Sequence, residues 1–242
     1  MTTYVRYELL RTFRNGRFFI FSLGFPLVLY FLIAGPNRDE HDLLQSGLSA
    51  PLYYMVGLAA FGAMMATTGS GARIAAERAV GWNRQLRITP LDSRSYIGAK
   101  VVTAYVTAVV SILLLYAAGT VLGVRLAAGN WLAMTALILV GLVPFAALGV
   151  LIGHLAGADT VGPAMGGTVS VLAFLGGTWF PITSGTLYDI ARYLPSYWLV
   201  QASHVSVGGH GWGTRGWLVM AAWSIALIVL AARVYRNDTK RV

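Results

Sequence analysis

The sequence predicts an all-α membrane protein with six transmembrane helices, and three observations lead to that prediction. First, 57% of the 242 residues are hydrophobic and only 11% are charged, with a mean hydropathy of +0.66. A water-soluble domain of this length carries far more surface charge. Second, the apolar stretches run for 16 to 22 residues without the alternation typical of membrane β-strands. Third, lipid offers no hydrogen-bond partners, so each apolar stretch must satisfy its own backbone groups, and a helix does this.

The six apolar stretches approach the roughly 20 residues that a helix needs to cross the hydrocarbon core of a bilayer. They are residues 18–34, 52–72, 101–122, 131–152, 164–180 and 217–232. Pro26 and Pro144 lie inside two of them, and each predicts a kink. No soluble domain, linker or tandem repeat interrupts the pattern, so we expect residues 1–242 to form one membrane domain.

Lysine and arginine are concentrated on one side of these predicted spans. Of the 18 basic residues, 14 precede the first span, connect the second to the third, or follow the last. The other connections hold only Arg38, Arg125, Arg192 and Arg215. The positive-inside rule therefore places both termini in the cytoplasm. The net charge of +9 follows from this topology, with attraction to anionic membrane lipid, and requires no nucleic-acid partner.

The first sixteen residues have the pattern of an interfacial helix. Val5, Leu9 and Phe13 share one helical face, whereas Glu8 and two arginines lie largely on the opposite face. We interpret residues 1–16 as an amphipathic anchor on the membrane surface.

The outer segment 181–215 contains two apolar pieces, residues 187–194 and 197–207, separated by Pro195. Each piece is too short to cross the membrane. Half-helices that re-enter the outer leaflet fit this pattern better than an ordinary loop does. We therefore predict an outer re-entrant segment between spans five and six.

Several kinds of chemistry lack the residues they need. The chain has no cysteine, and neither Lys100 nor Lys240 stands in a phosphate-binding loop. Ser70 and His154 are a weak pair for an intramembrane protease, and the histidines have no metal-ligand spacing. No span centre holds Asp, Glu, Lys or Arg, which disfavours an ion-coupled transporter. We expect no catalytic residue and no metal.

Small residues recur at four-residue intervals around the connection between spans four and five. Gly149, Gly153 and Gly157 form one stripe, and Gly162 and Gly166 begin another. Such stripes allow close helix–helix approach. They fit packing within one chain as well as they fit a dimer interface.

The connection between spans two and three, residues 77–98, is the most informative segment. Residues 77–91 read Glu-Arg-Ala-Val-Gly-Trp-Asn-Arg-Gln-Leu-Arg-Ile-Thr-Pro-Leu, and the Thr-Pro pair marks a helix boundary. A solvated positive-inside loop would explain the arginines but not the rest of the framework. The segment therefore suggests a rigid cytoplasmic elbow that receives force from a partner.

That framework resembles the Glu-Arg-x-x-Gly…Leu…Thr-Pro-Leu segment of ABC-2 type permeases, the membrane subunits of ATP-binding-cassette exporters. Two further stretches agree with it: Gly-Gly-Thr-Trp-Phe-Pro at 176–181 and Ile-Ala-Arg-Tyr-Leu-Pro-Ser-Tyr at 190–197. Together with the surface helix and six spans, the resemblance covers essentially the whole chain. Within the family, the chain looks most like the daunorubicin and multidrug-efflux branch.

The resemblance implies roles for particular residues. The segment that couples to the ATPase would contain Glu77, Arg78, Gly81, Trp82, Arg84, Thr89, Pro90 and Leu91, and Trp82 stands where many relatives have a smaller residue. The outer end of the translocation path would contain Trp179, Phe180, Pro181, Tyr193, Pro195 and Tyr197.

The resemblance also implies partners. Two ATP-binding subunits, each with ATP and Mg bound, would drive a dimer of permease chains in the bacterial inner membrane. This chain would bind no cofactor and would not itself be an enzyme.

The spans offer aromatic and methionine side chains for a path, including Phe61, Met64 and Met65, and no buried charge. Such a lining suits an amphipathic drug or antibiotic, unless these side chains simply face lipid. Export of a lipid-linked glycan or lipid is the alternative within this class. A non-transporting scaffold or sensor partner, and less readily a membrane enzyme, are the alternatives outside it.

Overall fold

The computed structural model describes residues 2–16, 20–81, 93–207 and 212–240. All regular secondary structure in these ranges is helical. The elements are α1 (Thr2–Phe13), the π-helical turn η1 (Ile20–Gly24), α3 (Phe25–Ala34), η2 (Leu43–Gln45), α4 (Ala50–Thr68), α5 (Ser70–Ala79), α7 (Ser93–Val121), α8 (Ala128–Gly141), α9 (Val143–Leu155), α10 (Val161–Leu175), α11 (Gly185–Ala191), α12 (Pro195–Gln201), η3 (Ala202–Val207) and α13 (Thr214–Lys240).

Four helical stretches are long and apolar enough to cross a membrane: Ala50–Ala79, Ser95–Val121, Ala128–Leu155 and Thr214–Arg236. They correspond to the second, third, fourth and sixth predicted spans. The first and fifth predicted spans appear as shorter apolar helices, Ser22–Ala34 and Val161–Leu175. The prediction of an all-helical membrane protein is therefore confirmed, while the count of six spans stays a prediction.

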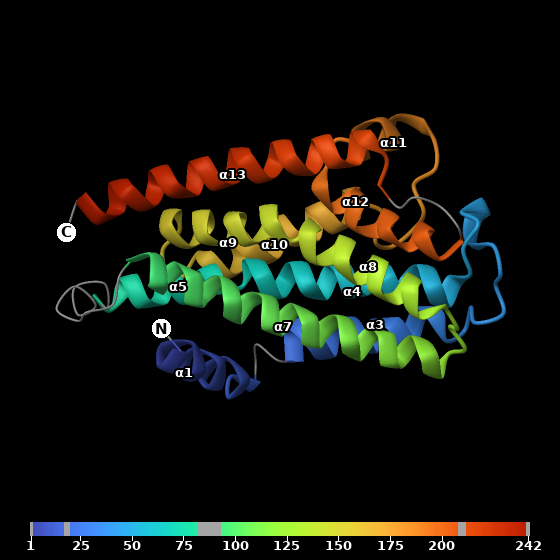
Figure 1. Cartoon of the computed structure of the whole chain (residues 1–242), viewed down its shortest axis with the longest axis horizontal. Coiled ribbons are helices and arrows are strands. Elements are labelled where there is room, and N and C mark those ends of the chain that lie inside the picture. Colours follow the sequence, from blue (N-terminus) through green and yellow to red (C-terminus); the bar gives the residue numbers. More distant parts are fainter. Residues whose placement is uncertain (1, 17–19, 82–92, 208–211, 241–242) are drawn as a thin grey trace.

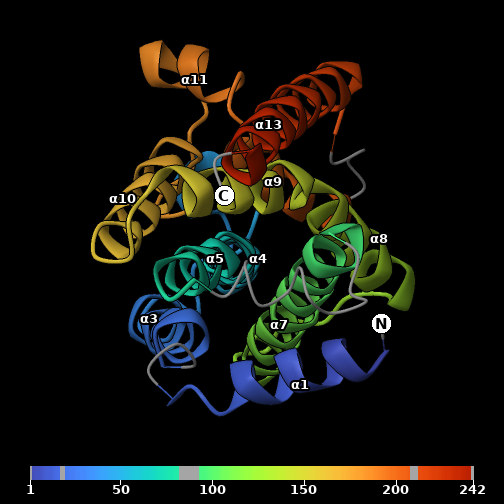
Figure 2. The same cartoon turned by 90° about the vertical axis from the view of Figure 1, so that its left-hand side faces the viewer.

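The long helices lie side by side along the long axis of the molecule (Figure 1). Seen from one end, α4 and α5 occupy the middle of the bundle, and α13 lies outside against α9 (Figure 2). Every residue of α4 except Met65 is buried. Because this helix is apolar on all sides, it has no polar face to offer to solvent and is stable only when surrounded.

Two of the long stretches are broken near their middle. Helix α4 passes into α5 at Gly69, and α8 passes into α9 at Leu142. Pro144 stands in the first turn of α9, where its missing N–H needs no partner. The second break thus lies where Pro144 predicts a kink.

Glycine brings the main chains of α5 and α9 into direct contact. A Cβ atom on Gly153 would lie 2.6 Å from the carbonyl oxygen of Gly71, and one on Gly149 would lie 2.8 Å from the carbonyl oxygen of Thr68. Any larger residue would force the helices apart. Gly149 and Gly153 therefore pack within the chain, whereas Gly162 and Gly166 face open space.

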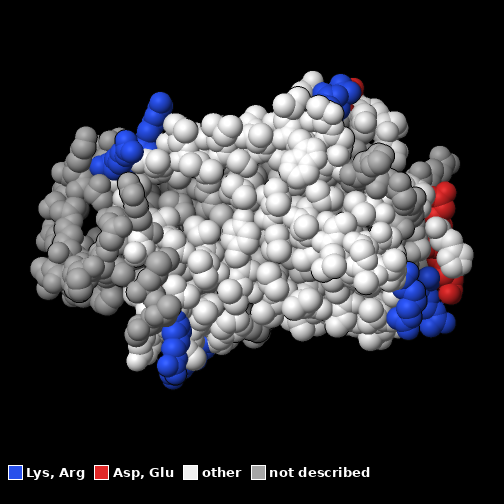
Figure 3. Space-filling model, in the orientation of Figure 1, with Lys and Arg blue, Asp and Glu red and all other residues white. Residues whose placement is uncertain are grey.

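The charged side chains on the visible face lie towards the ends of the molecule (Figure 3). A broad middle belt of that face shows neither Lys or Arg nor Asp or Glu. Such a belt matches the hydrocarbon layer of a bilayer, where a charged side chain is costly.

Candidate functional site: a buried ionic cluster

Glu77 lies on α5 with only 3% of its side chain exposed. Its Oε1 atom accepts hydrogen bonds from Lys100 Nζ at 2.6 Å and from Arg11 Nη1 at 2.9 Å. Its Oε2 atom accepts one from Tyr96 Oη at 2.6 Å. Both carboxylate oxygens are thus satisfied, as a buried charge requires.

Lys100, on α7, is fully buried and stands between two carboxylates. Its Nζ atom lies 2.6 Å from Glu77 Oε1 and 2.6 Å from Glu8 Oε1. A buried ammonium group is tolerated only when it is paired. Lys100 therefore connects α5 to the N-terminal helix α1 through one charge.

Glu8 has a second cationic partner on α5. Arg73 Nε lies 3.4 Å from Glu8 Oε1, and Arg73 also donates a hydrogen bond to the Thr12 hydroxyl. We call Glu8, Arg11, Arg73, Glu77, Tyr96 and Lys100 the ionic cluster. It contains two acids and three bases, so its formal charge is +1.

The cluster follows from the same spacing on three helices. Glu8 and Thr12 on α1, Arg73 and Glu77 on α5, and Tyr96 and Lys100 on α7 are each four residues apart. Residues at this spacing share one helical face. Helix α1 crosses the end of α7 (Figure 2), so the three polar faces converge at one point.

The cluster also shows how α1 packs on the bundle, whereas its predicted role as a membrane-surface anchor stays a prediction. The polar side of α1 packs against the bundle, because Glu8 and Thr12 are 4% and 1% exposed. Three apolar side chains, Tyr7, Leu10 and Phe13, are exposed instead. Charge pairing with α5 and α7 therefore decides how α1 is oriented, which its own amphipathic pattern does not reveal.

The predicted coupling residues fall into two groups. Glu77 is at the centre of the cluster, and Arg78 donates a hydrogen bond of 3.1 Å to the carbonyl oxygen of Gly153 on α9. Gly81 ends the α5 segment with a positive φ of 70°, which glycine adopts without strain. The other predicted residues, Trp82, Arg84, Thr89, Pro90 and Leu91, lie outside the described residues.

The residues predicted for the outer path are only partly brought together. Phe61 packs on Trp179 with ring centres 5.5 Å apart, and Phe180 packs on Phe174 at 5.3 Å. Met64 is fully buried in the core and Met65 lies beside that core.

Pro181 and Tyr197 line a small polar cavity of about 180 Å³, and Pro195 begins α12 next to it. Tyr193 is apart from these residues, 56% exposed, with the Arg215 guanidinium 4.6 Å from its ring centre.

This cavity also contains a histidine, His204, beside Tyr53 and Tyr188. Burial lowers the pKa of His204 below its usual value, and hydrogen bonds to the backbone at Gln201 and Ser46 act in the opposite direction. Whereas the ionic cluster is built from charges, this end of the molecule is built from hydroxyl groups and rings.

Sequence reasoning missed Glu8, Lys100, Arg73 and Tyr96. One signal for them exists, because the chain has only nine acidic residues and two lysines. Acids this rare, at positions 8 and 77 among many arginines, indicate specific pairing better than they indicate solvation.

Comparison with known proteins gives two results. A family described as "ABC-2 family transporter protein" matches residues 37–233, most of the chain. A protein of Bacillus subtilis (strain 168) named "Putative transport permease YvfS" is 27% identical over 236 residues, which cover 96% of this chain and 95% of that protein.

Proposed function

The chain belongs to the ABC-2 transporter family, and we propose that it is the permease subunit of an ATP-driven exporter. In this proposal the ionic cluster is the part of the chain that receives the motion of the ATP-binding partner. The observation that carries the proposal is the position of Glu77, buried between charges from two other helices.

The cluster ties together the two ends of the predicted coupling segment, residues 77–98. The chain leaves α5 just after Glu77 and enters α7 just before Tyr96, and these two side chains are hydrogen-bonded at 2.6 Å. A force applied to the residues between them therefore reaches the cluster from both sides. Through Lys100 and Glu8 the same force reaches α1.

A buried set of charges suits a two-state element. Separating one partner leaves an uncompensated buried charge, so intermediate arrangements are strongly disfavoured. A ligand or partner shifts such an equilibrium by its different affinity for the two states. ATP-driven closure of the partner subunits would supply that difference, and the spans would respond by opening inward or outward.

The partners and location follow from the same proposal. Two ATP-binding subunits, which bind ATP and Mg, work with two copies of this chain in a bacterial inner membrane. Both termini are cytoplasmic, six helices cross the membrane, and α11, α12 and η3 re-enter from the outer side. The 14 basic residues on one side of the spans support this orientation.

An amphipathic drug or antibiotic is the proposed cargo. Phe61 of α4 packs on Trp179 of the segment that follows α10, and Met64 and Met65 lie in or beside the same apolar core. The described spans do hold buried charges, which the sequence did not predict, but in the ionic cluster these charges pair with one another. A lipid-linked glycan remains the alternative cargo for the same machinery.

The test of coupling is Glu77→Gln, which keeps the shape of the side chain and removes its charge. We expect substrate stimulation of the complex's ATPase activity to fall roughly fivefold or more, the range of typical coupling energies. Basal ATPase activity and membrane insertion should be retained. Arg38→Gln, at an exposed outer position, is the matched control. Unchanged stimulation in Glu77→Gln would remove this residue from the coupling role.

The partner and the orientation are tested separately. Gentle affinity purification of the tagged chain should recover a P-loop protein in about equal amount. The chain alone, in several mild detergents, would favour the scaffold or sensor alternative. Cysteines introduced at Arg84 and Gly209 should be labelled from opposite sides of the membrane, and labelling from one side would refute the topology.

A further inference from the structure

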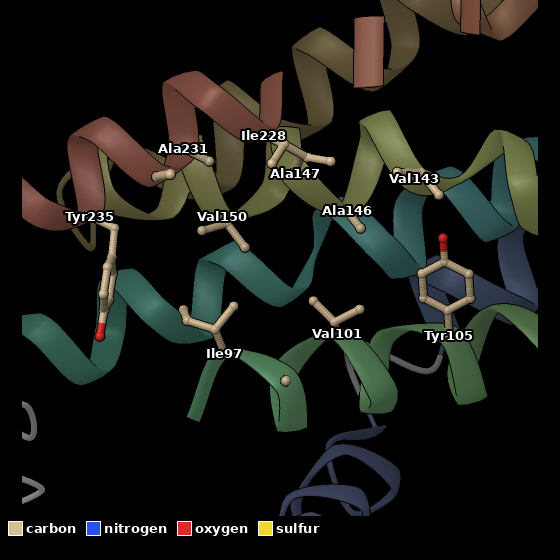
Figure 4. A pocket seen from close by; sticks show the side chains of 12 residues that line it. Ile97, Val101, Tyr105, Val143, Ala146, Ala147, Val150, Ile228, Ala231 and Tyr235 are labelled. Carbon is tan, nitrogen blue, oxygen red and sulfur yellow. The ribbon is translucent and has the colours of Figure 1, made fainter. Parts of the chain in front are cut away.

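An apolar groove of about 650 Å³ runs between α7, α9 and α13 (Figure 4). Val101 and Gly98 of α7 form one wall, Ala147 and Val150 of α9 form the floor, and Ala232 of α13 forms the other wall. Its volume falls in the range of ligand-binding pockets. The groove lies outside the ionic cluster and contains no residue of the predicted path.

The groove exists because its helices pack on different neighbours. Helix α13 packs on α9, whereas α7 packs on α4, so α7 and α13 stand apart. Small residues on all three helices, among them Gly98, Ala147 and Ala231, leave the space between them open. Larger side chains at these positions would close it.

The surroundings of the groove indicate lipid as its occupant. All three helices belong to stretches that are long and apolar enough to cross a membrane. Water would find few hydrogen-bond partners along this lining, and an empty space of this size would forfeit dispersion contacts. A hydrocarbon chain from the surrounding bilayer fills such a space at little cost.

Basic side chains of α13 lie near one end of the groove. Tyr235 marks that end, where its ring contacts His154 at 5.3 Å. Arg236 follows the lining residue Ala232 by one helical turn and is exposed, whereas Arg233 lies on the opposite face of α13. Basic residues beside a membrane surface attract anionic lipid headgroups, by about 1 kcal/mol each.

We propose that this groove binds an anionic phospholipid of the cytoplasmic leaflet, with one acyl chain between α7 and α13 and its phosphate at Arg236. The choice of leaflet rests on the proposed topology, but the occupant does not depend on the transported compound. The bound chain contacts α7 beside Tyr96 and Lys100, so the lipid would restrain the helix that carries half of the ionic cluster.

The test measures retained lipid. The full chain, with its co-purified partners, is reconstituted in nanodiscs of equal parts phosphatidylglycerol and phosphatidylcholine, extracted, and analysed by native mass spectrometry. We expect wild type to retain phosphatidylglycerol in excess over phosphatidylcholine. Ala232→Phe, which fills the groove from an exposed position, should lose this lipid, and Ala147→Leu should do the same from α9. Ala226→Phe, at an exposed position of α13 outside the lining, should keep it.

The charge is tested by Arg236→Gln, with Arg233→Gln, on the opposite face of α13, as its matched control. Arg236→Gln should lower the ratio of retained phosphatidylglycerol to phosphatidylcholine by roughly fivefold, at about 1 kcal/mol for one basic residue, and Arg233→Gln should lower it less. Equal retention of the two lipids by wild type would contradict the proposed preference for an anionic headgroup. Retention that survives both groove-filling variants would overturn the groove as the site. If those variants instead dissociate a dimer, the occupant is a second copy and the proposal is wrong.

These outcomes are separable from failure of the proposed function. Lipid retention is read without ATP or substrate, whereas the exporter proposal fails when no P-loop partner co-purifies.

Discussion

The two ends of the helix bundle are stabilised by different chemistry. At the end with α1, two carboxylates and three cations are joined by bonds of 2.6 to 3.4 Å. At the opposite end the ion pairs Arg192–Asp189 and Arg38–Asp39 are exposed on the acid's side, and the bonds inside the bundle are neutral. Tyr30 Oη donates to the Pro51 carbonyl at 3.1 Å, and Trp198 Nε1 donates to the Arg192 carbonyl at 3.1 Å. Loss of one member leaves an unpaired charge at the first end but only a weakened contact at the second. The first end is therefore suited to switching, and the second to holding a fixed shape.

Lys100→Met gives the largest effect expected from this difference. It leaves Glu8 and Glu77 buried without their shared cation, so the free energy of unfolding should fall by about 3–5 kcal/mol. Thermal unfolding in detergent measures it. Adding Glu8→Gln should recover part of the loss, because one of the two buried acids that lost this cation becomes neutral. Strictly additive losses would show that the two residues are not coupled.

Tyr96→Phe should have the next largest effect. It removes one hydrogen bond to the Glu77 carboxylate, which typically contributes about 1.5–3 kcal/mol. Tyr105→Phe, on the same helix and outside the cluster, is the control and should change the unfolding temperature less. Equal shifts in the two variants would mean that the charge of Glu77 does not strengthen the bond.

Tyr53→Phe makes the corresponding change at the end of the bundle opposite α1. Tyr53 donates to the carbonyl of Gly177, a neutral acceptor, so its loss should lower the free energy of unfolding by about 1 kcal/mol. If Tyr53→Phe is as unstable as Tyr96→Phe, the bond to the charged acceptor is no stronger than the bond to the neutral one, and the two ends do not differ in this respect.

Acidification should produce the smallest effect, at the end of the bundle opposite α1. The pKa of His204 is lowered in the folded chain, so below a pH of about 6.5 the unfolded chain binds more protons. The contribution of His204 to stability is thus complete above pH 6.5 and declines as the pH falls towards the folded pKa. Unfolding temperatures at a pH of about 7.5 and 5.5 measure this decline. His204→Gln should remove the part that belongs to this residue, and an identical decline in that variant would contradict the assignment.

The apolar runs predicted the helices well because their length and composition act locally. Helix α4 and the stretches Ser95–Val121 and Ala128–Leu155 fall where the hydropathy places them, and Pro144 accounts for the break before α9. The fifth run yields a shorter helix because the chain turns after α10. The first run is helical from Ile20 to Ala34, and its beginning lies outside the described residues.

The ionic cluster could be predicted only in part. Glu77 stands out within a family-like segment, but its partners lie 66 and 23 residues away on helices whose relative rotation no local pattern encodes. The packing of α1 on the bundle could not be predicted, for the same reason. The amphipathic pattern of α1 predicts a membrane-surface helix, but it does not show that Glu8 pairs with Lys100 and Arg73.

The glycine contact between α5 and α9 has a mechanical consequence. The main chains of the two helices touch at Gly71 and Gly153, and Arg78 donates a hydrogen bond across the same contact. The two helices therefore cannot move closer together or slide past each other freely. A movement that tilts α5 would tilt α9 with it as one rigid unit. Helix α13 packs on the other side of α9. A displacement of α5 at Glu77 would therefore be transmitted through the glycine contact to α9 and α13, on the opposite side of the bundle.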